Sequence, residues 1–228
     1  YHGWEEVSCS QLKQLNESPL SFFYRHVEKS QAQKSSPSLT YGSLLHEWAE
    51  LGSDEFWPRV IIAPDRVCTA TGSFGAKAKP WLDELDDGAI PISPSDYKQL
   101  RMQTHQIYAN SAARNLLVNA VDREFNIQWI WNGHKCRCRV DGATRQVFYD
   151  LKTTRDARIL KDFGRSAIKF GYHMQAAMYG AAAIAAGWPD HRMEFIVTST
   201  TWPHECEVVR LPKHVMEEGR VTCLRLLA

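Results

Sequence analysis

The sequence predicts an α/β fold with a central mixed β-sheet flanked by helices. Three strand-like segments follow one another at 124–131, 135–141 and 146–153. Two more, at 192–200 and 206–211, come near the end of the sequence, and helical periodicity lies before and between the two groups. This order of helices, a three-strand meander, a helix and two closing strands is typical of an α/β domain.

The first third of the chain is predicted to be mainly helical. A short helix at 10–15 ends at Ser18-Pro19, and a second helix follows it. A polar, serine-rich loop is expected at 31–38. An apolar stripe within 40–51 predicts a further helix, and the residues 63–79 show no period and are expected to form a long loop.

Capping and turn signals mark the remaining elements. Ser93-Pro94 offers a cap and a proline at the first helical position, which predicts a helix that extends to about Asn119. Asn132-Gly133 predicts a tight hairpin between the first two strands. A helix is expected over 167–186, where Gly187-Trp188-Pro189 ends it.

Length and composition fit one globular domain, and we predict that a single domain spans 1–228. No apolar run is long enough to cross a bilayer and the first residues resemble no secretory signal, so a cytoplasmic location is expected. The formal net charge of +1 neither supports nor excludes a nucleic-acid partner. The six cysteines lack a C-x-x-C pair and are expected to be buried free thiols.

Charged residues interrupt the apolar pattern of the three meander strands. Because side chains alternate across a strand, Asp150 and Lys152 share a face of the third strand with Phe148. We expect the three strands to bring four charged residues together on one polar patch: Glu124, Asp141, Asp150 and Lys152. The register of the strands, on which this patch depends, is not fixed by the sequence.

Such a patch has a specific chemistry. Clustered carboxylates repel each other unless a cation holds them together, and hard oxygen ligands suit Mg²⁺ or Mn²⁺. The metal can polarise a phosphate oxygen and lower the pKa of a bound water. A lysine beside it can orient that water or stabilise charge that develops on the phosphate. An Asp-x-Lys pair alone is a weak motif, and Asp141 on the preceding strand strengthens it.

This pattern resembles the PD-(D/E)xK nuclease superfamily and, more closely, the nuclease domain of the RecE family of exonucleases. Val140-Asp141 stands where Pro-Asp is common in the superfamily, and that proline is a turn device and not a ligand. The resemblance spans nearly the whole chain. Its segments are Tyr1-His2, Ser8-x-Ser10-x-Leu12, Ser18-Pro19, the stretch 41–46, and the motifs at 136–141, 149–154 and 172–179.

The resemblance implies a metal site. Asp141 and Asp150 match two metal-binding acids, and the carbonyl oxygen of Leu151 matches a backbone ligand. His46 matches a helical histidine that helps to bind metal, although a lone histidine on an amphipathic helix is more often structural. Glu124 matches an acid on the first strand. Mg²⁺ is the implied cofactor, and Mn²⁺ is expected to substitute for it.

The resemblance also implies catalytic groups. Lys152 matches the catalytic lysine. Gln175 and Tyr179 match the Q-x-x-x-Y element of RecB-like and lambda-exonuclease-like enzymes. Since residues four apart share a helix face, both side chains can point toward the same site.

Contacts to DNA are expected at two places. The first two helices resemble a region near the DNA entry or the 5′-phosphate pocket, where an arginine suits a phosphate. A solvated helix face explains these residues equally well, and the sequence leaves both interpretations open. The end of the catalytic strand could also contact the phosphate backbone. The candidates are Ser8, Ser10, Lys13, Arg25, Thr153 and Thr154.

The resemblance implies a phage-type exonuclease that digests one strand of duplex DNA from its ends in the 5′-to-3′ direction. The 3′ single strands that remain would serve a RecT-like annealing protein in recombination. A ring-shaped homo-oligomer, trimer or tetramer, is implied as well. No membrane partner is expected.

Two other functions fit the same residues. The protein could be another RecB-like nuclease, such as an endonuclease or a single-strand exonuclease. It could also be a non-catalytic DNA-binding module that keeps the nuclease fold, although the intact set of Asp141, Asp150 and Lys152 argues against this.

Overall fold

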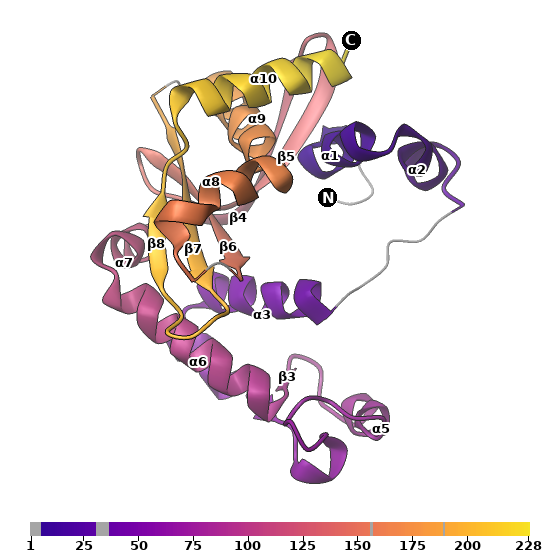
Figure 1. Ribbon diagram of the computed structural model, residues 1–228, viewed down its shortest axis with the longest axis vertical. Helices are drawn as coiled ribbons and strands as arrows, with labels where there is room; N and C mark the ends of the chain where they lie inside the picture. The colour runs from indigo at the N-terminus through magenta and orange to yellow at the C-terminus, as the bar shows by residue number, and fades with distance from the viewer. Residues whose placement is uncertain (1–5, 31–36, 156, 189) are drawn as a thin grey trace.

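A central six-stranded mixed sheet organises the molecule, as predicted (Figure 1). The computed structural model describes residues 6–30, 37–155, 157–188 and 190–228. The neighbours run β1-β5-β6-β7-β8, and β4 pairs with the other edge of β5. Two pairs, β1 with β5 and β6 with β7, are parallel, and the rest are antiparallel. The strands are β1 Val7–Ser8, β4 Asp122–Trp131, β5 His134–Ala143, β6 Val147–Thr154, β7 Arg192–Ser199 and β8 Cys206–Val209.

Helices cover both faces of this sheet. One layer holds α1, α8, α9 and α10, whose buried side chains pack with those of β5 and β7. The opposite layer holds α3, α4, α6 and α7, which pack on the other face of β6 and β7. These helices are α1 Cys9–Glu17, α3 Pro37–Leu51, α4 Ser53–Arg59, α6 Pro94–Ala109, α7 Ser111–Val118, α8 Ile159–Lys169, α9 Tyr172–Ala185 and α10 Lys213–Leu226.

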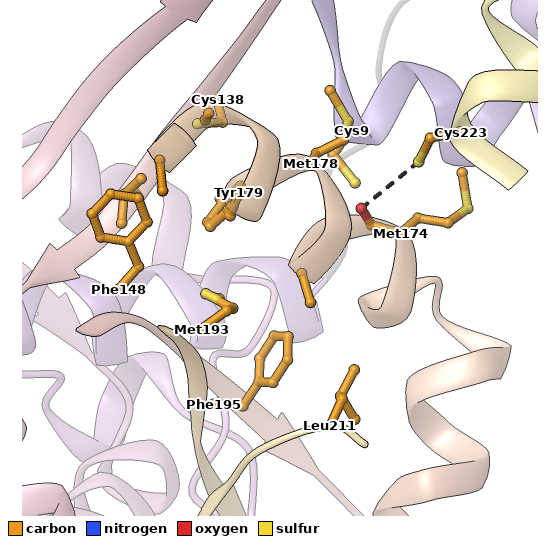
Figure 2. Packing of buried hydrophobic residues seen from close by; sticks show 14 of the residues in the cluster. Cys9, Cys138, Phe148, Met174, Met178, Tyr179, Met193, Phe195, Leu211 and Cys223 are labelled. Carbon is orange, nitrogen blue, oxygen red and sulfur yellow. Dashed lines mark hydrogen bonds between the residues drawn. The ribbon is translucent and has the colours of Figure 1, made fainter. Parts of the chain in front are cut away.

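The layer that contains α9 forms the larger core (Figure 2). Helix α10 lies against α9 at Gly219, where a Cβ atom would be 2.2 Å from the carbonyl oxygen of His173. Only glycine allows this approach. Nearby, the Cys223 thiol donates a hydrogen bond to the carbonyl of Met174 over 3.8 Å. All six cysteines are free, as expected, and five are buried, whereas Cys68 is only partly buried.

A small unit lies away from the central sheet. Two short parallel strands, β2 and β3, pair with each other, and Figure 1 shows the segment around α5 and β3 projecting beyond the end of α6. Its separate apolar cluster consists of Ala63, Val67 and Ala78 with partly buried neighbours. The remaining elements are α2 Pro19–Phe22, a π-helical turn Phe23–Val27, β2 Val60–Ile62, a 3₁₀ turn Asp65–Val67, α5 Ala78–Asp83 and β3 Ile90–Ile92.

Two helices that were expected to be continuous are divided. The helix predicted from Ser93 to Asn119 breaks at Asn110, whose side chain accepts hydrogen bonds from two backbone N–H groups of α7 and caps it. The helix predicted over 167–186 contains only the last residues of α8 and then α9, and the two are separated at Gly171 with φ +64°. A capping side chain and a left-handed glycine each end a helix locally.

Other boundaries also differ from the expectation. Helix α3 begins at Pro37, so the loop predicted at 31–38 is wrong for its last two residues, and 31–36 and Tyr1-His2 lie outside the described residues. The loop over 63–79 contains a 3₁₀ turn and runs into α5. Helices α4, α5 and α10, most of α8, and the strands β1, β2 and β3 were not predicted.

Candidate active site

A gap in the central sheet creates the site. On one edge of β5, β1 pairs at Cys136 and Arg137, and β6 pairs only at Gly142 and Ala143. Along this edge the structure records no strand partner among the described residues for 138–141. Side chains satisfy backbone groups there instead. The Arg139 carbonyl accepts a hydrogen bond from the Tyr179 hydroxyl over 2.5 Å, and the Leu151 N–H donates to Asp141 Oδ2 over 2.8 Å.

Three side chains of metal-ligand type meet at this gap. The potential ligand atoms of His46 on α3, Glu124 on β4 and Asp141 on β5 lie within 4.8 Å of one another. His46 Nδ1 is 3.2 Å from Asp141 Oδ2 and 3.9 Å from Glu124 Oε1. One imidazole nitrogen and two carboxylates form a donor set that suits a hard divalent cation such as Mg²⁺ or Mn²⁺.

Asp150 lies apart from the three ligand-type residues, and its role as a metal ligand stays a prediction. Phe148 packs in the same layer as Val140, so Asp150 and Lys152, which share its side of β6, begin on the α9 side of the sheet. Asp141 instead points to α3, where it meets His46. The side chain of Asp150 is 2% exposed and lies outside the group of three ligand-type residues.

Buried Asp150 anchors two other side chains. One of its oxygens forms an ion pair with Lys152, and the other accepts a hydrogen bond from the Gln175 amide. The same amide donates to the Tyr179 hydroxyl over 3.2 Å. Gln175 and Tyr179 thus point toward the same site, as predicted. Asp150 contacts Gln175 on one side and Lys152 on the other.

Two lysines lie beside the ring of Tyr172. The Nζ atoms of Lys152 and Lys13 lie 5.3 Å and 5.2 Å from its centroid. Lys13 also donates a hydrogen bond to Gln175 over 3.4 Å, and its aliphatic stem fills the space beside Gly171, where a Cβ would be 2.9 Å away. Helix α1 is therefore fixed against the start of α9, and Lys13 lies beside the catalytic candidates.

Electrostatics couple the two carboxylates on opposite sides of the sheet. Burial raises the pKa of Asp141 to about 7, and the nearby charge of Asp150 adds to the increase. Burial lowers the pKa of His46, but Asp141 and Glu124 outweigh it and the net pKa is raised. For Lys152 burial also acts downward, yet Asp150 and Asp141 raise its pKa overall, so its ammonium group stays charged.

These groups open into one pocket of about 630 Å³. Its lining includes His46, Glu124, Asp141, Leu151 and Lys152. The backbone N–H of Leu151 donates a hydrogen bond to Asp141, and metal binding by its carbonyl stays a prediction.

Arg139 and Tyr172 are among the pocket residues to which the sequence gave no role. Arg139 forms an ion pair with Glu124, and Tyr172 contacts both lysines. Arg139 precedes Asp141 by two residues on the same strand, and Tyr172 begins the motif of Gln175. Proximity to these motifs was the signal available in the sequence.

The expected DNA-binding residues lie in different surroundings. Ser8 is buried and caps α1, with Ser10 Oγ 3.0 Å from its hydroxyl. Arg25 is half-buried on the π-helical turn. Thr153 lines the pocket, and Thr154 continues β6 into an adjoining groove. Their contacts with DNA stay predictions.

Comparison with known proteins places this geometry in a family. The model of the PDDEXK-like domain of unknown function (DUF3799) matches residues 8–227. The chain belongs to this family. Its PD-(D/E)xK assignment agrees with the strand-borne acids and lysine of the pocket. Membership in the RecE family specifically is not part of this finding, and no curated protein matches the sequence.

Solved structures support the fold. A "Putative exonuclease" from Eubacterium rectale has a TM-score of 0.68 at 14% identity, over 98% of this chain and 80% of that one. A second structure, SSO0001, has a TM-score of only 0.30 at 18% identity over 86% of this chain and 85% of that one. The first similarity shows a shared fold. Within the described part of the chain, no helix is both long enough and apolar enough to cross a membrane.

Proposed function

We propose that this protein is a metal-dependent exonuclease that digests one strand of duplex DNA from its ends. One observation carries the proposal: the ligand-type atoms of His46, Glu124 and Asp141 face the same pocket as the ammonium group of Lys152. A phosphodiester is the substrate that needs this combination, because hydrolysis builds negative charge beside the attacked phosphorus.

His46, Glu124 and Asp141 would hold the cation, Mg²⁺ in the first place and Mn²⁺ as its substitute. A bound divalent cation supplies positive charge beside the phosphate and acidifies a water molecule. The chain's own groups do the rest. Lys152 stabilises charge on the phosphate, Asp150 and Tyr172 hold Lys152 in place, and Gln175 orients Asp150.

End-labelled linear duplex DNA tests the reaction. With Mg²⁺, the wild type is expected to release label progressively, whereas Asp141→Asn and Lys152→Ala are expected to lose roughly 100-fold or more in rate. Lys135→Ala is the matched control, because Lys135 is an exposed strand lysine away from the pocket. Thermal melting of each variant shows whether it folds. Full activity in either folded pocket variant would overturn the assignment.

Substrate form and polarity need separate comparisons. Digestion of linear duplex without cleavage of covalently closed circles supports an exonuclease, and cleavage of the circles supports the alternative of an endonuclease. Labels at the 5′ and 3′ ends distinguish the proposed 5′-to-3′ direction from its reverse. Calorimetry with Mg²⁺ or Mn²⁺ addresses the non-catalytic DNA-binding module, which predicts no metal binding.

The proposal includes the assembly and partner that the RecE resemblance implies. A ring-shaped trimer or tetramer would keep the enzyme on DNA, and a RecT-like annealing protein would take up the 3′ single strands. Light scattering of the purified protein tests the first part. Co-purification with a single-strand annealing protein tests the second.

A further inference from the structure

A second groove continues from the catalytic pocket. It has a volume of about 950 Å³ and shares Thr153 and Tyr172 with that pocket. Its lining includes Thr153 and Thr154 at the carboxyl end of β6, Arg155 directly after it, and Lys169 and Phe170 at the end of α8. The two cavities are therefore parts of one continuous surface.

The charged groups of this groove suit a polyanion. Arg155 and Lys169 are both exposed, and neither forms an ion pair with a carboxylate of the described residues. On the same helix, by contrast, Arg158 and Arg165 both pair with Asp162. The groove lining has one acid, Asp96, which accepts a hydrogen bond from Ser93 over 2.6 Å at the start of α6. Positive charge thus remains available on the α8 side.

The groove also offers an aromatic surface. Phe170 is 50% exposed, and Lys169 Nζ lies 5.4 Å from its ring centroid. The ring is in contact with Tyr172 at a centroid distance of 5.9 Å, so an aromatic path leads toward Lys152. An exposed ring beside cations that have no carboxylate partner in the described structure is the combination that binds single-stranded nucleic acid, in which the bases stack on the ring and the phosphates meet the cations.

We propose that this groove binds a single DNA strand next to the scissile phosphate, with a base stacked on Phe170 and phosphates at Arg155 and Lys169. The proposal rests on the proposed nuclease function, from which the identity of the strand follows. A duplex is a poor occupant, because its base faces are covered by stacking and cannot reach Phe170. Hydroxyl groups of Thr153 and Thr154 line the path between the groove and the pocket.

Fluorescence anisotropy tests the groove without hydrolysis. The probes are a short labelled oligo(dT) and a short blunt duplex, each titrated in EDTA so that no strand is cut. Phe170→Ala is expected to weaken oligo(dT) binding about tenfold or more through lost stacking. The double variant with Arg155→Ala and Lys169→Ala should reduce the magnitude of the slope of log K against log salt concentration by roughly 1.4, since two phosphate contacts are lost. Duplex affinity should change much less.

Matched controls lie on the same helix outside the groove. Leu160→Ala and Lys161→Ala remove an exposed apolar and an exposed basic side chain, and both should bind oligo(dT) like the wild type. Melting temperatures confirm that each variant folds, and Lys169→Gln provides a milder charge change if the double variant does not. Unchanged oligo(dT) affinity, or equal losses for oligo(dT) and duplex, overturns the proposal.

The result can be separated from that of the nuclease proposal. If the wild type cuts labelled duplex but the groove variants bind oligo(dT) normally, only the groove assignment fails. If the wild type cuts nothing while the groove variants lose oligo(dT) binding, the groove stands and the nuclease proposal fails.

Discussion

Asp141 and Asp150 lie on neighbouring strands, and their carboxylates point to opposite layers of the molecule. Asp141 meets His46 of α3, whereas Asp150 meets Gln175 of α9. Each still feels the charge of the other, because both are shielded from water. The ammonium group of Lys152 forms an ion pair with Asp150 and is also attracted by the charge of Asp141, so it interacts with acids of both layers. A metal bound at Asp141 would therefore also change the electrostatic surroundings of Asp150 and Lys152.

Metal binding is expected to depend on pH through Asp141. Burial raises the pKa of this carboxyl to about 7, so the metal-free site is largely protonated at pH 6 and ionised at pH 8. Because a metal binds the ionised carboxylate and the neutral imidazole, and the pKa of His46 is raised as well, apparent affinity for Mn²⁺ should fall at least about tenfold per pH unit below 7.

Calorimetry in buffers of different ionisation enthalpy measures the protons released on binding. Release should be substantial at pH 6 and small at pH 8. Affinity that is constant from pH 6 to pH 8 would show that Asp141 is already ionised in the metal-free protein. Lys135→Ala serves as the control that leaves this behaviour unchanged.

Tyr172 is expected to act as a positioning residue for Lys152. Its ring lies 5.3 Å from the ammonium group, and removal of such a cation–π contact costs roughly 1 kcal/mol, which corresponds to about fivefold in rate if it acts only in the transition state. Tyr172→Ala should therefore lower kcat more than it changes KM, and should shift the basic limb of the pH–rate profile. Tyr172→Phe keeps the ring and should restore both. Equal losses in the two variants would assign the effect to the hydroxyl group.

At the scale of elements, periodicity and turn chemistry predicted much of the secondary structure. The hairpin at Asn132-Gly133 formed because both residues adopt positive φ, at 50° and 79°. Gly171 also has a positive φ and separates α8 from α9, but it lies inside a continuous apolar pattern, so the sequence did not indicate a break there. Helix α10 was not predicted. Gly219 lies within it because α10 packs closely against α9, and this contact between distant parts of the chain is not visible in the local sequence.

Strand alternation predicted faces correctly only where the strands are regular. Glu124 has φ +48°, and Asp141 and Gly142 of the paired strand both turn toward the α3 layer, where Gly142 lies against the ring of Tyr149. Alternation cannot be extended through such an irregularity. The sequence therefore named several residues that line the pocket, but it did not indicate that Asp150 lies outside the group of ligand-type residues or that Arg139 and Tyr172 line the pocket.

The whole molecule combines two large cores around the sheet with one small cluster in the projecting unit. Strands β2 and β3 are anchored, because Ile90 and Ile92 belong to the core on the α3 side. Beyond them, Ala63, Val67 and Ala78 are the only fully buried apolar residues of the small cluster in the described structure. Since apolar burial supplies most folding stability, this part has little of its own.

Native-state hydrogen exchange should reveal that difference. The backbone N–H groups of Val67, Cys68 and Gly75 are hydrogen-bonded within the projecting unit, whereas those of β7 belong to the central sheet. We expect the first group to exchange through local opening, at a free energy about 3 kcal/mol or more below that of β7 and with little dependence on urea. Equal free energies and equal urea dependence in both groups would mean that the projecting unit unfolds only with the whole molecule.

Metal binding at His46, Glu124 and Asp141 should raise protection in β5 and leave the projecting unit unchanged, because the three ligand-type residues lie outside it.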